Sequence, residues 1–160
     1  MSYKEVNGDL IKLAKEGSFD VITHGCNCFS NMGAGIAVPM KNNFRCSDFP
    51  LERPETAGDI NKLGQIDWKP IGIAPGKVVN VVNSYTQYIP NAKAKPLDYE
   101  ALALCMRKIN KVFNGKHIGL PQIGAGLAGG DWERIKQIIQ TELKDCDITV
   151  VIYKQNEDRI

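Results

Sequence analysis

Three observations predict an α/β domain built from layers, with a largely parallel sheet. Apolar strand-like segments alternate with amphipathic helical segments, most clearly from residue 77 to the end of the chain. Two glycine-bearing loops each follow a strand pattern and precede a helical pattern. The chain has 160 residues, 43% of them hydrophobic and 24% charged, which is typical of one globular domain with a core of ordinary size.

Each element is predicted from the period of its apolar residues and from the residues at its ends. Strand patterns occupy residues 3–6, 19–23, 64–68, 77–83, 117–120 and 147–153. Helical patterns occupy residues 10–16, 36–44, 97–113 and 132–143. The 97–113 helix is the clearest, because four apolar residues share one face before Asn114-Gly115 closes it. Between these elements, 45–62 predicts irregular structure with a short helix around 54–62, and 154–160 predicts a polar tail.

Composition and charge argue against several classes of protein. The net charge of +2 is too small to indicate nucleic-acid binding by bulk electrostatics. No segment approaches the roughly 18 consecutive apolar residues of a membrane-spanning helix, so no membrane partner is expected. The N-terminus lacks the apolar core of a signal peptide, and five cysteines form no disulfide framework spacing. We therefore expect a cytoplasmic protein with reduced thiols.

The stretch 23–37 has the pattern of an anion-binding loop. It begins where the apolar pair Val21-Ile22 ends, contains Gly33 and Gly35 but no acidic residue, and runs into a helical pattern. A helix N-terminus presents backbone N–H groups and partial positive charge, which favours an anion such as phosphate. A purely structural turn is the alternative interpretation.

A second glycine loop, Gly124-Ala125-Gly126-Leu127-Ala128-Gly129, matches G-x-G-x-x-G between a strand and a helix. It predicts close approach of the backbone to a pyrophosphate, with a merely tight turn as the alternative. A nicotinamide dehydrogenase is disfavoured, because one strand follows and it ends at Tyr153-Lys154, where a ribose-binding acid is expected. No P-loop pattern occurs.

Four polar or aromatic residues stand where a ligand would meet these loops. His24 is a candidate general acid or base, or a residue that only positions a ribose. Asp131 is an N-cap, or its carboxylate faces the reacting centre. Asn27 suits ribose hydroxyls, and Tyr153 stacks on a base or packs at the sheet edge.

A metal site is not predicted. His24, Cys26 and Cys28 alternate over five residues, but zinc needs four ligands and the second histidine, His117, is far along the sequence. Cys105 falls near the buried face of a helix and is expected to be core.

Taken together, four segments resemble macro domains, a family that binds ADP-ribose. They are Gly8-Asp9-Leu10, the 21–37 stretch, residues 120–132 and the strand that ends at Tyr153. The resemblance implies a single macro domain over 1–160, with a three-layer α/β/α fold around a mixed, mostly parallel central sheet. It also implies ADP-ribose or its 1″-phosphate as the ligand, ADP-ribosylated protein as a further partner, and neither a metal nor a cofactor.

The resemblance assigns a role to each matching position. Asp9 would bind the adenine amino group with Leu10 beside it, Asn27 would meet the distal ribose, and Tyr153 would lie near the adenine. The two loops would hold the phosphates through Gly33, Ala34, Gly35, Ile36, Ala37, Ile123, Gly124, Ala125, Gly126, Leu127, Ala128 and Gly129.

The motifs are most similar to the branch that contains ADP-ribose 1″-phosphate phosphatases. That similarity rests on His24-Gly25-Cys26-Asn27, on Met-Gly-Ala-Gly-Ile-Ala at 32–37 and on Pro-x-Ile-Gly-x-Gly-Leu at 121–127. It implies hydrolysis of ADP-ribose 1″-phosphate to ADP-ribose and phosphate, with His24 and Asp131 as the catalytic residues.

Two alternatives stay open. One is a non-catalytic ADP-ribose reader. The other is a glycohydrolase that removes ADP-ribose from modified carboxylate side chains. In that branch a lysine follows the middle strand, whereas the alignment puts Gln87 there, with Lys93 and Lys95 farther along the loop.

Overall fold

The computed structural model describes residues 1–153, so the polar tail predicted for 154–160 lies outside the described residues. The strands are β1 (Tyr3–Asn7), β2 (Val21–Cys26), β3 (Ile66–Ala74), β4 (Lys77–Tyr85), β5 (His117–Leu120) and β6 (Asp147–Ile152). The α-helices are α1 (Leu10–Lys15), α2 (Ala37–Phe44), α3 (Tyr99–Val112) and α4 (Trp132–Glu142). Short 3-10 helices occupy much of the segment between α2 and β3.

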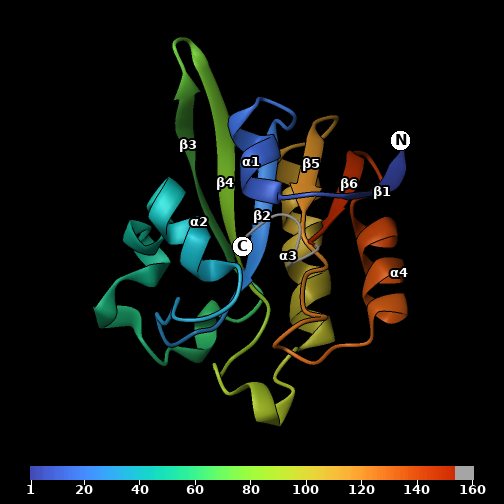
Figure 1. Cartoon of the computed structure of the whole chain (residues 1–160). Helices are drawn as coiled ribbons and strands as arrows, with labels where there is room; N and C mark the ends of the chain where they lie inside the picture. The colour runs from blue at the N-terminus through green and yellow to red at the C-terminus, as the bar shows by residue number, and fades with distance from the viewer. Residues whose placement is uncertain (154–160) are drawn as a thin grey trace.

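The strands form one sheet in the order β1-β6-β5-β2-β4-β3 (Figure 1). Every neighbouring pair is parallel except β3 and β4, which form an antiparallel hairpin at one edge. The mixed, mostly parallel sheet that the sequence predicts is therefore confirmed. Because the parallel strands run the same way, the loops that follow β2, β4 and β5 meet at one edge.

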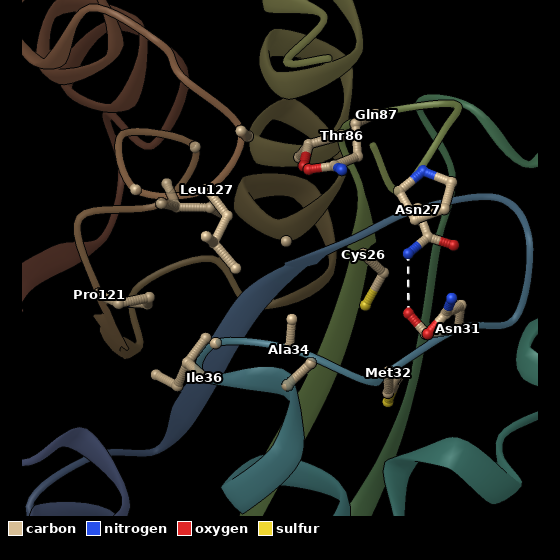
Figure 2. Close-up of a pocket in the computed structure, with 18 of the residues that line it drawn as sticks. Cys26, Asn27, Asn31, Met32, Ala34, Ile36, Thr86, Gln87, Pro121 and Leu127 are labelled. Carbon is tan, nitrogen blue, oxygen red and sulfur yellow. Dashed lines mark hydrogen bonds between the residues drawn. The ribbon is translucent and has the colours of Figure 1, made fainter. Parts of the chain in front are cut away.

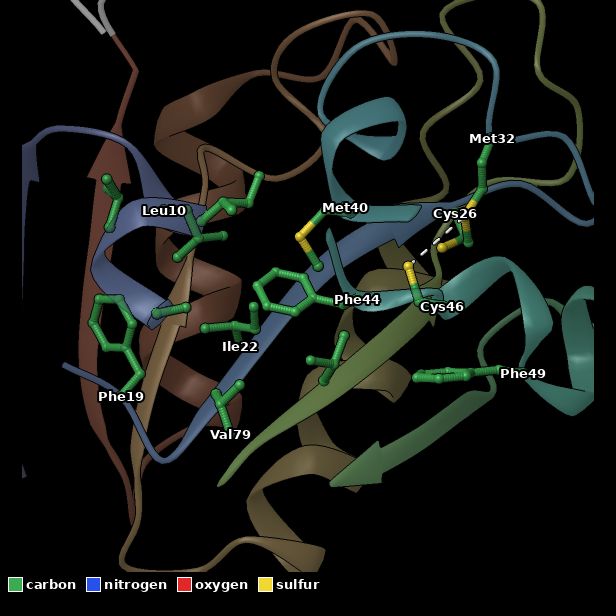
Figure 3. Packing of buried hydrophobic residues seen from close by; sticks show 14 of the residues in the cluster. Leu10, Phe19, Ile22, Cys26, Met32, Met40, Phe44, Cys46, Phe49 and Val79 are labelled. Atoms are coloured by element: carbon green, nitrogen blue, oxygen red, sulfur yellow. Dashed lines mark hydrogen bonds between the residues drawn. The ribbon is translucent and has the colours of Figure 1, made fainter. Parts of the chain in front are cut away.

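Helices cover both faces of the sheet and enclose two hydrophobic clusters. On one face α1 and α2 bury Leu10, Met40 and Phe44 against β2 and β4 (Figure 3). On the other face α3 and α4 bury mainly aliphatic side chains against β5 and β6. Their amphipathic pattern fixes which face each helix presents to the sheet. This arrangement confirms the three layers.

Several predicted boundaries need correction. β2 continues through His24 to Cys26, although these residues look like loop, because this segment keeps pairing with β4 up to Tyr85. β3 extends to Ala74 rather than ending at residue 68. The short helix expected around 54–62 is instead two 3-10 turns, Pro54–Thr56 and Ile60–Lys62.

Membrane insertion through a helix has no support in this fold: within residues 1–153, no helix is long and apolar enough to span a bilayer.

Candidate ligand pocket

A pocket of about 470 Å³ opens at the carboxyl ends of β2, β4 and β5 (Figure 2). Three connections line it, each of which directly follows one of these strands. The lining residues are Gly25, Cys26, Asn27, Asn31, Met32, Gly33, Ala34, Gly35, Ile36, Ala37, Thr86, Gln87, Pro90, Pro121, Gln122, Ile123, Gly124, Gly126, Leu127 and Ala128. The two glycine loops thus face the same cavity, as the parallel topology predicts.

The first loop is shaped by its own asparagines. The Asn27 side chain donates from Nδ2 to the Asn31 carbonyl (2.8 Å) and accepts at Oδ1 from the Phe29 N–H (2.9 Å). Asn31 Oδ1 accepts from the Gly33 N–H at 3.0 Å. These bonds hold the loop open and leave the next four backbone N–H groups, 34–37, without a hydrogen-bond partner within residues 1–153. Donors of this kind at the start of α2 are available to an anion.

The second loop uses its glycines in two ways. Gly124 and Gly129 have left-handed φ values of 77° and 72°, and a Cβ at either would crowd Leu97 or Lys95. Their presence is therefore explained by chain geometry alone. Gly126 differs, because a Cβ there would meet nothing within 4 Å. The backbone N–H groups of 126–128 also make no hydrogen bond within the described part of the chain.

None of the lining residues carries a formal charge at neutral pH. The polar surface of the cavity consists of backbone amides, four carboxamides, one hydroxyl and one thiol. Burial raises the pKa of the Cys26 thiol well above its usual value, so this group is also neutral. An anion in the pocket would be held by dipoles and N–H groups rather than by an ion pair.

His24 lies behind the pocket wall and does not line it. Its ring is fully buried, and Nε2 lies 2.8 Å from Asn83 Oδ1. Asn83 Nδ2 donates to the Cys46 carbonyl (3.0 Å), which orients the amide and makes Nε2 the protonated nitrogen. Burial lowers the His24 pKa to about 4, so the ring is neutral at pH 7. This placement does not favour the predicted role of His24 as general acid.

Asp131 is also outside the pocket lining. Its Oδ1 accepts from the Glu133 N–H at 3.1 Å, so the side chain is the N-cap of α4. Its backbone N–H donates to the Tyr99 hydroxyl at 2.9 Å. The structure therefore gives Asp131 a capping role and does not bring it together with His24 in the cavity.

The residues expected near adenine gather at the same carboxyl end of the sheet, but beside β1 and β6. Asp9 follows β1 and Tyr153 follows β6, and these strands pair in parallel with Asn7 opposite Ile152. Asp9 Oδ1 caps α1 by accepting from the Ile11 and Lys12 N–H groups. The adjacent Leu10 is 2% exposed. None of the three predicted residues lines the pocket.

The sulfur atoms of Cys26, Met32 and Cys46 lie together (Figure 3). Cys26 Sγ and Cys46 Sγ each lie 3.7 Å from His24 Nε2, and Cys46 Sγ is 3.9 Å from Met32 Sδ. Burial raises the pKa of Cys46 to about 12, so its thiol stays protonated. Within residues 1–153, no group of three or more His, Cys, Asp or Glu side chains is arranged to hold a metal ion.

A buried carboxyl group, Glu52, and a half-buried one, Asp67, lie outside the pocket lining. Burial raises the pKa of Glu52 to about 7, partly offset by the Lys62 ammonium. Burial also raises the pKa of Asp67, which accepts from the Tyr85 hydroxyl at 3.2 Å. The Lys62 ammonium donates to the Leu51 carbonyl at 2.8 Å and to the Ser30 hydroxyl at 3.3 Å. These groups support the loop from behind and do not face the cavity.

Most of the predicted site residues line the pocket, although their roles stay predictions. Those that do are Asn27, Gly33, Ala34, Gly35, Ile36, Ala37, Ile123, Gly124, Gly126, Leu127 and Ala128. Those that do not are Asp9, Leu10, His24, Ala125, Gly129, Asp131 and Tyr153. Sequence reasoning missed several lining residues, chiefly Thr86 and Gln122. The signal that would have found them is their position directly after a parallel strand.

The curated relatives of this chain include a phage protein and a mycobacterial glycohydrolase. No family model matches the chain. An uncharacterized 17.5 kDa protein of Enterobacteria phage T4 is 33% identical over 156 residues, which cover 94% of this chain and 96% of the phage protein. A DNA ADP-ribosyl glycohydrolase of Mycobacterium tuberculosis is 24% identical over 148 residues. That match covers 92% of this chain but 40% of the glycohydrolase.

Solved structures share the fold. The macrodomain of Thermus aquaticus DarG superposes with a TM-score of 0.67 and 22% identity, covering 95% of this chain and 97% of that one. Thermosipho africanus DarTG, solved in complex with ADP-ribose, gives a TM-score of 0.70 at 17% identity. It covers all of this chain and 43% of that one. The chain therefore belongs to the same family as the 17.5 kDa protein of phage T4, and it has the macrodomain fold that its sequence resembles.

Proposed function

We propose that the pocket binds ADP-ribose, with the diphosphate on the two glycine loops. The observation that carries this proposal is the set of backbone N–H groups at 34–37 and 126–128 that have no partner within residues 1–153 and belong to residues lining one cavity. The cavity of about 470 Å³ is within the usual range for small-molecule sites. The fold is shared with a protein solved with ADP-ribose bound, which supports the choice of ligand.

The physical basis of diphosphate binding is electrostatic but involves no cationic side chain. The N-terminus of α2 adds the partial positive charge of the helix dipole beside the amides of Ile36 and Ala37. Backbone donors fixed in advance lose little entropy on binding, so several together can replace the hydration of a diphosphate. Gly126 lets the ligand come close to the backbone, because no side chain intervenes.

We propose as a second activity the release of ADP-ribose from a conjugate at its distal ribose. The similarity to a DNA ADP-ribosyl glycohydrolase along 92% of this chain supports this activity. The sequence motifs favour a phosphate ester at the same position, as in ADP-ribose 1″-phosphate. In either reaction water provides the new oxygen, at phosphorus for the ester or at C1″ for a glycoside, and the leaving group takes a proton.

The geometry limits which groups could accelerate such a reaction. His24 and Asp131 are not aimed into the cavity, so rate enhancement would come from positioning the substrate and from backbone dipoles. Gln87 lines the cavity where the glycohydrolase branch is expected to have lysine. The neutral carboxamide can orient a water or a leaving group but does not act as a strong base.

A single set of incubations tests both proposals. The protein is titrated with ADP-ribose by calorimetry, and then incubated with ADP-ribose 1″-phosphate, ADP-ribosylated single-stranded DNA and protein ADP-ribosylated on carboxylates. Binding of ADP-ribose supports the first proposal, and release of ADP-ribose from one conjugate supports the second. Binding without release from any conjugate leaves a reader and contradicts the second proposal. Absence of ADP-ribose binding contradicts the first.

A further inference from the structure

Thr86 carries a buried hydroxyl that the fold does not use. It directly follows β4, and its backbone is fixed on both sides: the N–H donates to the Cys26 carbonyl (3.2 Å), and the carbonyl accepts from the Asp98 N–H (2.9 Å). The residue is 1% exposed and lines the pocket (Figure 2). Its Oγ1 has no hydrogen-bond partner within the described residues. A buried hydroxyl without a partner is destabilising, so its retention needs an explanation.

A glycine packs directly against this hydroxyl. A Cβ on Gly25 would lie 2.8 Å from Thr86 Oγ1 and 3.4 Å from Ile123 Cγ1. Any side chain at position 25 would therefore press on the hydroxyl. Since Gly25 has no left-handed φ, its lack of a side chain is not required by backbone strain. The lack of a side chain at position 25 therefore lets Thr86 Oγ1 pack against the main chain at the pocket wall.

Other polar side chains at this end of the pocket are already engaged. Both polar atoms of the Asn27 carboxamide bond within the 27–31 loop. Gln87 donates from Nε2 to the Ile89 carbonyl at 2.9 Å, which leaves its Oε1 as an acceptor. This end of the pocket therefore offers a hydroxyl and a carbonyl oxygen but no cation. That set complements a neutral, hydroxyl-bearing group and disfavours a second anion.

We propose that Thr86 Oγ1 hydrogen-bonds a hydroxyl of the distal ribose, and that it is a ligand contact the motifs do not contain. This inference rests on the proposed binding of ADP-ribose and specifies one end of that site. With the diphosphate on the amides of 34–37 and 126–128, the sugar beyond it reaches the wall formed by Gly25 and Thr86. A ribose hydroxyl can donate and accept, as the threonine hydroxyl can, so either direction of the bond satisfies both groups.

The test compares two ligands and two matched variants by calorimetry. ADP-ribose has the distal ribose and ADP lacks it. Thr86→Val removes the hydroxyl and keeps the shape, whereas Thr86→Ser keeps the hydroxyl. We expect Thr86→Val to weaken ADP-ribose binding about tenfold and to leave ADP binding unchanged, because only the hydroxyl–sugar bond is lost. Thr86→Ser is expected to stay within about threefold of wild type for both ligands.

Two results would overturn the inference while leaving the proposed function standing. One is unchanged ADP-ribose affinity in Thr86→Val, and the other is an equal loss for ADP-ribose and ADP. If wild type binds no ADP-ribose, the proposed function and this contact both fail. Thermal unfolding of each variant checks its fold, and Thr86→Ala, which also lacks the hydroxyl, replaces Thr86→Val if that variant does not fold.

Discussion

The pocket wall and the strand ends behind it use polar groups in opposite ways. In the wall, the backbone amides of 34–37 and 126–128 face the cavity with no hydrogen-bond partner within residues 1–153. Behind it, His24 bonds Asn83, and Tyr85 bonds Asp67. The groups at the cavity wall are therefore neutral, whereas titratable groups such as His24 lie behind the wall.

This difference shows why residue type alone does not identify which groups contact a ligand in such a site. A histidine at the end of a strand suggests acid–base catalysis. It can act as an acid or base only if its ring points toward the substrate. β2 places His24 on the sheet face covered by α2, where burial keeps it neutral. Glycine and alanine have no polar side-chain group, but their small size exposes the backbone donors that a diphosphate needs.

The largest expected effect is on stability, from His24. His24→Ala removes a buried ring and leaves Asn83 Oδ1 without its donor, so we expect a loss of about 4 kcal/mol in unfolding free energy. Urea unfolding measures the loss. The folded variant should keep ADP-ribose affinity within about threefold, since the ring does not line the pocket. Loss of turnover at unchanged stability would instead support a catalytic role.

The next effect concerns pH. Burial raises the pKa of Glu52 from 4.5 to about 7, so its protonated form favours the folded state. That contribution is full below pH 4.5 and is lost as pH rises through 7. Glu52→Gln mimics the protonated form, so its unfolding free energy should match wild type near pH 4.5 and exceed it by up to about 3 kcal/mol above pH 7. A difference that does not change with pH contradicts this.

His24 acts with the opposite sign and provides an internal check on Glu52. Its folded pKa of about 4 lies below the ordinary 6.5, so its stabilising contribution is present above pH 6.5 and is lost as pH falls through 4. Between pH 4.5 and 6.5 the changes in unfolding free energy with pH that come from Glu52 and His24 nearly cancel in wild type. In Glu52→Gln the stability should therefore rise with pH over this window.

A negative charge introduced into the first loop should weaken ligand binding without changing the unfolding free energy. Ala34 is exposed and lines the pocket, so Ala34→Asp places a carboxylate beside the proposed diphosphate. We expect a loss of about 100-fold in ADP-ribose affinity, with unfolding free energy within about 0.5 kcal/mol of wild type. Ala34→Asn is the neutral control and should lose much less. Equal losses in both variants, or a loss that does not shrink at high salt, would argue against a bound diphosphate.

The smallest expected effect is at Asp131. Removal of an N-cap in Asp131→Ala should lower unfolding free energy by about 1 kcal/mol, whereas Asp131→Asn keeps a capping oxygen. Neither variant should alter ADP-ribose affinity. If both variants abolish turnover of a conjugate while remaining folded, Asp131 has the catalytic role that its motif implies.

The sequence predicted the elements well where apolar periodicity is strong. β5 matches its predicted range, and α3 starts two residues late because Asp98 caps it. β3 was cut short in the prediction, since Pro70 and Gly72 disfavour a strand interior. The structure tolerates both residues because β3 is an edge strand, where a missing N–H can face away from β4.

The site was predictable in its backbone and less so in its side chains. Glycine loops after two strands identify the cavity, because parallel strands bring their carboxyl ends together. The position of Thr86 after β4 indicates a lining residue, but its unpartnered hydroxyl is not predictable, since it depends on the approach of Gly25 and the burial of Oγ1. His24 and Asp131 were assigned by motif; their side chains bond Asn83 and the Glu133 N–H, and their catalytic role stays a prediction.

The account is tested most directly by calorimetric titration of wild-type protein with ADP-ribose at pH 5.5, 7 and 8. No lining side chain titrates in this range, so the account predicts one-to-one binding with a dissociation constant that changes less than about threefold. The absence of binding would contradict the proposed site. A tenfold change in affinity across this range would show that a titrating group contacts the ligand, contrary to the contrast between the neutral wall and the buried groups behind it.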